Sequence, residues 1–260
     1  MGDIEQSEHR GTGGPKVSIV VATYNAAATL ERCLRSLESQ TASEWELLVP
    51  DGQSTDDTLD ILARHSSLLA WTESSPDSGI YDAWNKALRH AQGEYVCFLG
   101  ADDAWADKGA LARLLSAIGD ARYDLVTSRG AVISGDSEAY EFGSAMDFRR
   151  LGRRMMVCHP GLLHRRELFL KYGEFDASLK IVGDLEFLLR LPMSSRTLHV
   201  DSLSVRVDGS GVSREQIGRR LREQRDVLVR SPRYGLVRGY LAWFDKLWRW
   251  PIARLLNLPF

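Results

Sequence analysis

The sequence predicts an α/β fold with a mostly parallel sheet, helices on both of its faces and a basic helical tail. Two observations lead to this prediction. Short apolar runs rich in β-branched residues, such as Val17–Ala22, alternate with segments whose apolar residues recur at helical spacing. A strand buried on both faces has such a continuous apolar run, and regular alternation with helices is typical of a parallel sheet.

Strands and helices alternate through the first half of the chain. The strands are predicted at Val17–Ala22, Trp45–Val49, Leu68–Thr72, Tyr95–Leu99 and Asp124–Thr127. The helices between them are predicted at Ala28–Ser39, Ser54–His65, Ile80–Ala91 and Lys108–Ile118. Polar residues at the start of the second helix can cap it, and Gly93 ends the third.

The second half of the chain has a less regular pattern. Ala131–Phe142 is predicted to form a strand pair and Leu203–Val207 a single strand, while Arg165–Tyr172 and Asp184–Leu191 are predicted helices. A long Arg-rich helix is predicted up to Arg230, where Pro232 stops it; Ser213 and Gln216 form a capping-box pair at its start. Later in the tail, Pro251 is expected to break the apolar and basic segment Leu236–Leu258.

The composition is that of an ordinary folded protein. With 260 residues, 44 % of them apolar and 26 % charged, and a net charge of −2, the chain is expected to form one domain, or one domain with an appendage. No run of about 18 apolar residues occurs, which argues against a polytopic membrane protein. Three widely spaced cysteines favour neither a disulfide framework nor zinc, so a reducing compartment is expected. We expect a disordered leader at 1–15, a domain at 16–212 and a helical, basic and aromatic extension at 213–260.

Positive charge is concentrated in the C-terminal tail. Residues 214–260 hold eleven basic residues against four acidic ones, together with three of the seven tryptophans. Such a mixture suits a membrane interface, but it also suits a helix that packs its apolar face on the domain with its arginines in water. Both alternatives stay open. Nucleic acid is not an expected partner, because no RNA- or DNA-binding module accompanies the arginines.

Acidic residues follow three of the first four predicted strands: Asp51, Asp77 and the pair Asp102–Asp103. Ligands of an open parallel sheet bind at the carboxyl ends of its strands. Clustered carboxylates repel one another unless a cation lies among them, so the Asp102–Asp103 pair suits Mg²⁺ or Mn²⁺ and a phosphorylated substrate. The alternative for each aspartate is a turn or helix-capping role. The sequence has no GxGxxG, GxxxxGK[ST] or GxSxG, which disfavours dehydrogenases, P-loop kinases and α/β-hydrolases.

Several segments, in this order, resemble the inverting family 2 glycosyltransferases of bacterial surface-polysaccharide synthesis. They are VSIVVATYNAAATLERCLRSLESQT, ELLVPDGQSTDDT, SGIYDAWNKALRHAQGEYVCFLGADD and CHPGLLHRRELFLKYGEFDASLKIVGDLEFLLRL. The resemblance covers roughly residues 16–208. It implies a GT-A fold, which is a Rossmann-like, mostly parallel sheet with helices on both faces.

The resemblance also implies roles for single residues. Thr23, Tyr24 and Asn25 would line the nucleotide pocket after the first strand, and Asp51 would bind the uracil or ribose. Asp102 and Asp103 would form the metal-and-donor motif, with Asp103 the direct metal ligand. Asp184 would be the catalytic base.

The sequence departs from the family pattern in three places. The metal motif is Ala101-Asp102-Asp103, so the first position of a strict DxD is Ala or Gly. The base motif often has two acidic residues together, but here it is Gly183-Asp184-Leu185-Glu186, so Glu186 is the alternative base. Many relatives carry an Arg-Asn pair in the third helix, where this chain has Trp84-Asn85, which leaves Lys86 or Arg89 as the charge partner of the phosphates. His159 would either touch the diphosphate or acceptor, or hold a loop.

The expected function is therefore metal-dependent sugar transfer from a nucleotide-diphosphate sugar, UDP-sugar first, to a hydroxyl of a glycan acceptor, lipid-linked in the leading hypothesis. The expected location is the cytoplasm, with the tail as a candidate for contact with the inner membrane leaflet. Two alternatives remain: a non-catalytic sugar-nucleotide or glycan-binding module on the same fold, and a nucleotidyltransferase. The second normally needs a Gly-rich basic loop after the first strand, and residues 23–27 contain neither Gly nor Lys.

Overall fold

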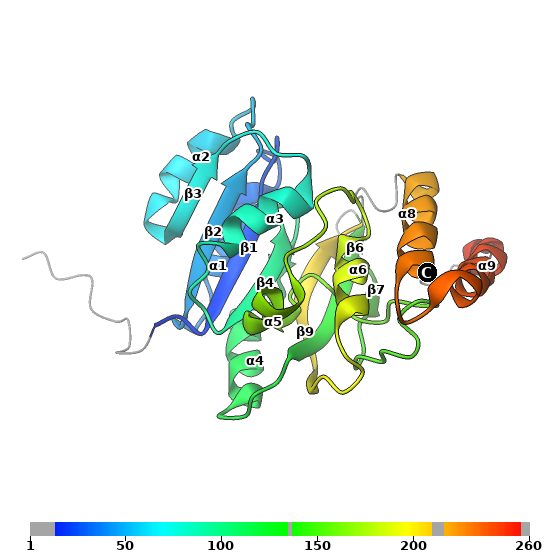
Figure 1. Cartoon of the computed structure of the whole chain (residues 1–260). Coiled ribbons are helices and arrows are strands. Elements are labelled where there is room, and N and C mark those ends of the chain that lie inside the picture. The colour runs from blue at the N-terminus through cyan, green and yellow to red at the C-terminus, as the bar shows by residue number, and fades with distance from the viewer. Residues whose placement is uncertain (1–13, 135–136, 210–215, 256–260) are drawn as a thin grey trace, which may run out of the picture.

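The structure, a computed structural model, describes residues 14–134, 137–209 and 216–255 (Figure 1). The expected leader at 1–15 lies almost wholly outside the described residues. The expected capping contact of Ser213 lies outside them as well.

One mixed sheet forms the centre of the described part of the chain (Figure 1). Its strands are β1 Val17–Ala22, β2 Trp45–Asp51, β3 Leu69–Ser74, β4 Tyr95–Gly100, β5 Ala104–Trp105, β6 Leu125–Ser134, β7 Ser137–Phe142, β8 Leu163–Arg165 and β9 Thr197–Asp208. Their order is β3-β2-β1-β4-β8-β6-β9-β5, with β7 paired to β6 alone. The predicted mostly parallel sheet is confirmed.

The order of strands differs from simple alternation after β4. The pairs β3–β2, β2–β1, β1–β4 and β6–β9 are parallel, but β8 lies antiparallel between β4 and β6. The fifth predicted strand is therefore part of β6, which does not pair with β4. The predicted strand pair at 131–142 is the second half of β6 with β7. The two-residue strand β5 carries no periodic signal, and the sequence did not predict it.

Helices cover both faces of the sheet, as predicted. They are α1 Leu30–Glu38, α2 Thr58–Arg64, α3 Ile80–Leu88, α4 Ala110–Ile118, α5 Glu167–Tyr172, α6 Gly183–Arg190, α8 Ile217–Arg230 and α9 Gly235–Leu255, with a 3-10 turn at Ser66–Leu68. One apolar core lies between the sheet and α1, α2 and α4. The other lies between the sheet and α3, α5, α6 and α8. Alternate residues of one strand serve the two cores: Ile19 packs in the first and Val20 in the second.

Strands β1, β2 and β4 end at the same level of the sheet, so the loops that follow them lie together. Ala22 is the register partner of Gly100, and Thr23 forms a parallel bridge with Asp51. The loops after β1, β2 and β4 therefore meet at one edge of the sheet, which is the edge where an open α/β sheet binds its ligand.

The tail forms two helices on the side of the molecule next to α6 (Figure 1). Val227 and Leu228 of α8 and Ala242 of α9 enter the second core, so the tail does pack on the domain. The expectation that Pro251 breaks the tail is wrong, because α9 continues to Leu255. Proline removes one backbone donor and can kink a helix without ending it. Within the part of the chain that the structure describes, no helix combines the length and apolarity needed to span a bilayer.

Candidate active site

The carboxylate of Asp51 ties together the loops after β1, β2 and β3. It is 2 % exposed and accepts hydrogen bonds from Thr23 Oγ1 (2.9 Å), the Ser54 amide and hydroxyl (2.9 and 2.5 Å) and Ser74 Oγ (2.6 Å). Burial by itself raises the pKa of Asp51, but the hydrogen bonds from Ser54, Ser74 and Thr23 outweigh it and hold the pKa below its ordinary value. Asp51 is thus ionised, and it holds the neighbouring segments in place at this edge of the sheet.

Asn25 also holds the loop after β1 in place, through contacts with the loop after β2. Its backbone has φ 48°, a left-handed conformation that asparagine tolerates better than most residues. Its amide donates to Ser54 Oγ at 2.8 Å, and its side-chain oxygen accepts from the Thr55 amide at 2.8 Å. Between these anchors the Tyr24 ring is 68 % exposed. The loop therefore offers Tyr24 as an open aromatic surface and uses Thr23 and Asn25 to hold it.

Gly52 allows the loop after β3 to lie close to Tyr24 in the loop after β1. A β-carbon at this position would lie 2.6 Å from Oδ2 of Asp77 and 3.4 Å from the Tyr24 ring. Any larger residue at position 52 would push the Asp77 carboxylate away from Tyr24. Asp77, the acidic residue after β3, therefore lies beside Gly52 and Tyr24, a position that was not predicted from the sequence.

Three aspartates gather where β4 and β9 end. Asp102 and Asp103 lie in the turn after β4, and Asp208 is the last residue of β9. The two oxygens of Asp103, which is 5 % exposed, accept from the amides of Gly100 (2.9 Å) and Asp208 (3.1 Å). Arg32 of α1 donates to the Asp102 carbonyl and lies 3.8 Å from Oδ2 of Asp208. Asp103 thus holds the turn, while Asp102 is the less buried of the pair.

The electrostatics of this acidic corner fit a cation. Burial raises the pKa of Asp102, and the nearby Asp208 raises it further, although the Asp102 amide and Arg32 oppose this. Burial, followed by the charge of Asp102, raises the pKa of Asp103 to about 7. A divalent ion would relieve this repulsion. Among the described residues, no group of three His, Cys, Asp or Glu side chains is arranged to hold a metal ion.

Asp184 is the second residue of α6 and faces α3. Its Oδ1 accepts a hydrogen bond from the Tyr81 hydroxyl at 3.4 Å and another from the Leu185 amide at 2.7 Å. The preceding residue, Gly183, makes this approach feasible, because a β-carbon there would lie 2.8 Å from the Tyr81 ring. The departure from a doubly acidic motif therefore has a steric reason: the ring of Tyr81 occupies the space of a side chain at position 183.

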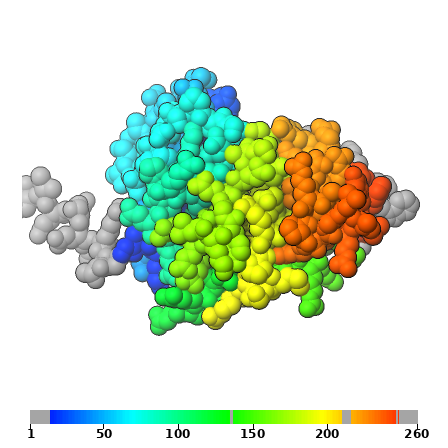
Figure 2. Space-filling model, in the orientation of Figure 1, coloured from blue at the N-terminus to red at the C-terminus, as the bar shows by residue number. Residues whose placement is uncertain are grey.

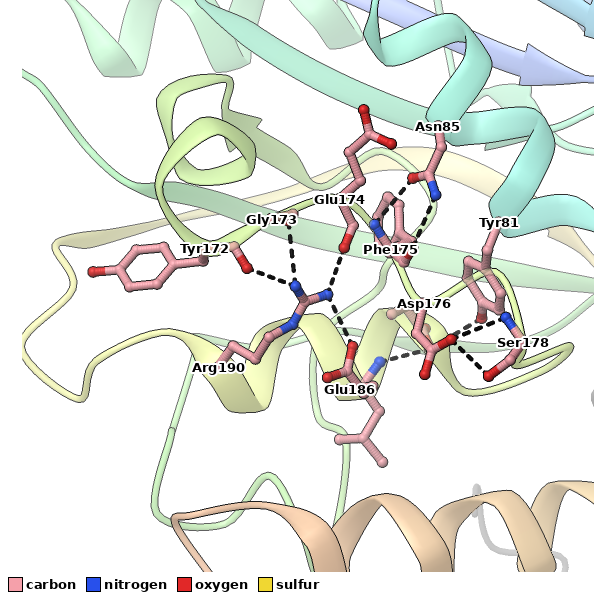
Figure 3. A network of polar contacts seen from close by, with 12 residues as sticks. Tyr81, Asn85, Tyr172, Gly173, Glu174, Phe175, Asp176, Ser178, Glu186 and Arg190 are labelled. Atoms are coloured by element: carbon pink, nitrogen blue, oxygen red, sulfur yellow. Dashed lines mark hydrogen bonds and ion pairs between the residues drawn. The ribbon is translucent and has the colours of Figure 1, made fainter.

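Glu186 is turned toward a different set of partners. It forms an ion pair with Arg190 at 2.9 Å, and the same guanidinium donates to the carbonyl oxygens of Tyr172 (2.6 Å) and Glu174 (2.8 Å) (Figure 3). Burial raises the pKa of Glu186, and Arg190 opposes that shift. Glu186 thus helps to hold the chain between α5 and α6.

Two further anchors hold the segment that leads to Asp184. Asn85, buried in α3, accepts from the Phe175 amide at 3.0 Å and donates to the Phe175 carbonyl at 2.8 Å (Figure 3). Glu223 of α8 accepts from the amides of Lys180 and Ile181 at 3.2 and 2.9 Å. Neither role could be found from the sequence, since both depend on contacts between distant elements.

Lys86 and Arg89, the expected charge partners of the phosphates, contact groups of the protein. Lys86 donates to Ser75 Oγ and to the Pro76 carbonyl, and Arg89 pairs with Glu174 at 3.2 Å. A different cation, Lys180, lies over Gly79 at the start of α3, with Nζ 3.3 Å from where a β-carbon of Gly79 would be. Lys180 is therefore a candidate charge partner of the phosphates that was not predicted from the sequence.

His159 lies inside an aromatic cluster. It is 7 % exposed and stacks on Trp84 with ring centroids 5.6 Å apart. Burial lowers the pKa of His159 to about 4, so the ring is neutral. This position supports the alternative that His159 has a structural role.

The sequence profile of the family described as "Glycosyl transferase family 2" matches residues 18–174. A "PGL/p-HBAD biosynthesis glycosyltransferase" of Mycobacterium bovis is 35 % identical over 194 residues, which are 72 % of this chain and 75 % of the relative. The chain belongs to glycosyltransferase family 2. It is therefore an enzyme that transfers sugars, and the expected family is confirmed.

Solved structures share the architecture at low sequence identity. Staphylococcus aureus TarS 1–349 in complex with UDP-GlcNAc has a TM-score of 0.67 at 21 % identity, over 89 % of this chain and 71 % of TarS. The mannosyltransferase PcManGT of Pyrobaculum calidifontis, in complex with GDP-Man and Mn²⁺, has a TM-score of 0.63 at 21 % identity, over 94 % and 76 %. The predicted GT-A fold of this glycosyltransferase is confirmed.

Proposed function

We propose that this family 2 enzyme transfers a sugar from a nucleotide-diphosphate sugar, UDP-sugar first, to a hydroxyl of a lipid-linked glycan or glycolipid, with inversion and with a divalent metal. Its M. bovis relative is named for glycolipid-related biosynthesis, TarS was solved with UDP-GlcNAc and PcManGT with Mn²⁺. Because the acceptor would be lipid-linked, we also propose that the enzyme works in the cytoplasm at the inner face of the membrane.

The position of Asp184 is the observation that best supports this proposal. Asp184 is half-buried at the start of α6, whereas Glu186 is tied to Arg190. In the proposed step the acceptor oxygen attacks the anomeric carbon, Asp184 takes the hydroxyl proton and the bond to the β-phosphate oxygen breaks. The nucleoside diphosphate leaves with the bonding pair. A carboxylate positioned for this transfer contributes about 10²–10⁴-fold in rate.

The opposite end of the site would hold the donor. We propose that Thr23, Tyr24, Asn25 and Asp51 form the nucleotide pocket, with Asp77 beside them and Lys180 as the cation for the diphosphate. Asp102 is the proposed direct metal ligand in place of Asp103, because it is the less buried of the two carboxylates. A metal bound there would stabilise the negative charge of the leaving diphosphate.

The alternative is a non-catalytic module that binds the same nucleotide sugar. The ordered surroundings of Asp184 favour catalysis, since a binding module has no need of a carboxylate held by Tyr81. The deciding experiment incubates the enzyme with a panel of UDP-, GDP- and dTDP-sugars, Mn²⁺ and polyprenyl-linked acceptors, and follows acceptor glycosylation by mass spectrometry. A glycosylated acceptor that depends on Asp184 supports the proposal. Donor binding without transfer to any acceptor supports the module.

A further inference from the structure

One face of α9 is apolar and exposed to solvent. The exposed fractions of its side chains are Leu236 64 %, Val237 69 %, Tyr240 40 %, Leu241 64 % and Phe244 58 %. At about 100° per residue, these five positions form one stripe along the helix. Ten large apolar side chains are exposed over the described residues, so half of them lie on these two and a half turns of helix.

The opposite face of α9 packs on α8 between Gly239 and Trp243. Gly239 lies against the backbone of Leu228 and Val229, where a β-carbon would come within 2.8 Å, and Ala242 is buried. Trp243 donates from Nε1 to the Leu221 carbonyl at 2.8 Å. The apolar stripe is thus the side of α9 that is turned away from α8. The residues of α8 and α9, in orange and red, lie together at one end of the described part of the molecule (Figure 2).

The two tail helices carry a net positive charge, and Arg238 lies on α9 itself. Residues 216–245 contain seven arginines against three acidic residues. Arg219, Arg222, Arg230 and Arg238 are exposed. A second copy docking stripe to stripe would bring these like charges together, whereas a lipid surface with anionic headgroups complements them. An amphipathic helix with apolar residues on one side and arginines around it lies in the membrane interface.

We propose that the outer face of α8 and α9 docks on an anionic lipid bilayer. This docking also orients the enzyme relative to the bilayer. The docked helix α8 carries Glu223, which holds the amides of Lys180 and Ile181 ahead of Asp184, so the docked face is joined directly to the segment that leads to Asp184. The docking itself is independent of the sugar transferred, but its use in presenting a lipid-linked acceptor rests on the proposed function.

Co-sedimentation of the full chain with vesicles tests the docking surface. Vesicles of phosphatidylcholine alone are compared with vesicles that also contain phosphatidylglycerol, at low and high salt. We expect binding to the anionic vesicles, weakened by salt, and a loss of about tenfold in partition coefficient for L241D/F244D and for R222Q/R238Q. The matched controls L170D and R35Q/R64Q alter equally exposed residues elsewhere and should bind as the unmodified chain does.

Two further measurements make the result decisive. Thermal unfolding midpoints show that each variant folds, and UDP affinity in the presence of Mn²⁺ reports the donor site separately. Vesicle binding that is unchanged in L241D/F244D, or absent from the unmodified chain, overturns the docking proposal. So does sedimentation as a dimer that L241D/F244D converts to a monomer without any binding to vesicles. Failure of sugar transfer with normal vesicle binding would instead contradict the proposed function alone.

Discussion

The hydroxyl of Tyr81 lies 3.4 Å from Oδ1 of Asp184, and this contact joins the start of α3 to the start of α6. Tyr81 is 3 % exposed. Burial, with the charge of Asp184 second, raises the pKa of Tyr81 well above its ordinary value, so the phenol keeps its proton and acts as a donor. The carboxylate is therefore oriented by a neutral group that does not compete with it for a proton.

Gly183→Ala should weaken this arrangement even though alanine is the better helix former. The added methyl group would lie 2.8 Å from the Tyr81 ring and displace it from Asp184. We expect a fall in kcat together with a destabilisation of about 1–3 kcal/mol, the usual cost of overpacking. Transfer kinetics and urea unfolding measure the two effects. A variant that is more stable and fully active would show that Tyr81 has room to move.

Asp184→Asn should keep donor affinity and lose transfer by about 10²–10⁴-fold, because only the removal of the acceptor proton is affected. Glu186→Gln is the matched control and should lose much less, since Glu186 is engaged by Arg190. Single-turnover transfer with a working acceptor measures both. An inactive Glu186→Gln with an active Asp184→Asn would assign the base to the other carboxylate.

Periodicity and motif order predicted much of this site because its residues lie at strand ends or helix starts. Thr23, Asp51 and Asp102 are identified by the strands that precede them, and Asp184 by its motif. Asp208 was missed, since it ends a strand in the irregular second half and meets Asp103 only through the pairing of β5 with β9. The antiparallel insertion of β8 was missed for a similar reason: three residues carry too little pattern to give a direction.

Asp51→Asn should destabilise the enzyme at neutral pH by about 1–3 kcal/mol, because an amide cannot replace all of its accepted hydrogen bonds. The folded-state pKa of Asp51 is lowered, so the ionised form contributes stability above the unfolded-state pKa of about 3.9. That contribution is lost as the pH falls through the folded-state pKa. The stability difference between the two proteins should therefore shrink below about pH 4. A stability difference that stays constant from pH 7 to pH 3 would contradict the conclusion that Asp51 is ionised when it accepts these hydrogen bonds.

Asp102→Asn should lower the Mn²⁺-dependent affinity for UDP by more than about tenfold and leave the unfolding midpoint nearly unchanged. Asp103→Asn should act mainly on stability, since its carboxylate accepts the Gly100 and Asp208 amides. Titration calorimetry with and without Mn²⁺, beside thermal unfolding, separates the two effects. If Asp103→Asn folds normally and alone loses the Mn²⁺ response, Asp103 is the direct ligand after all.

Glu223→Ala should lower kcat by about tenfold, because it frees the segment before Asp184. The affinity for UDP with Mn²⁺ should fall as well, because the same segment carries Lys180, the proposed cation for the diphosphate. Glu223→Gln keeps an oxygen that can accept the Ile181 amide and should restore most of the activity. Equal losses in both variants would mean that the charge of Glu223, and its ion pair with Arg219, matters more than the hydrogen bonds.

The contact between the Asp208 amide and Asp103 spans 105 positions of the chain. The strands β1 to β4, whose following loops carry the proposed nucleotide pocket, are complete by Gly100 and pair with one another. Synthesis runs from the N-terminus, and contacts that close long loops form late. A growing chain thus assembles the proposed nucleotide pocket first and the acidic corner last, so the proposed donor pocket forms before the proposed metal site is complete.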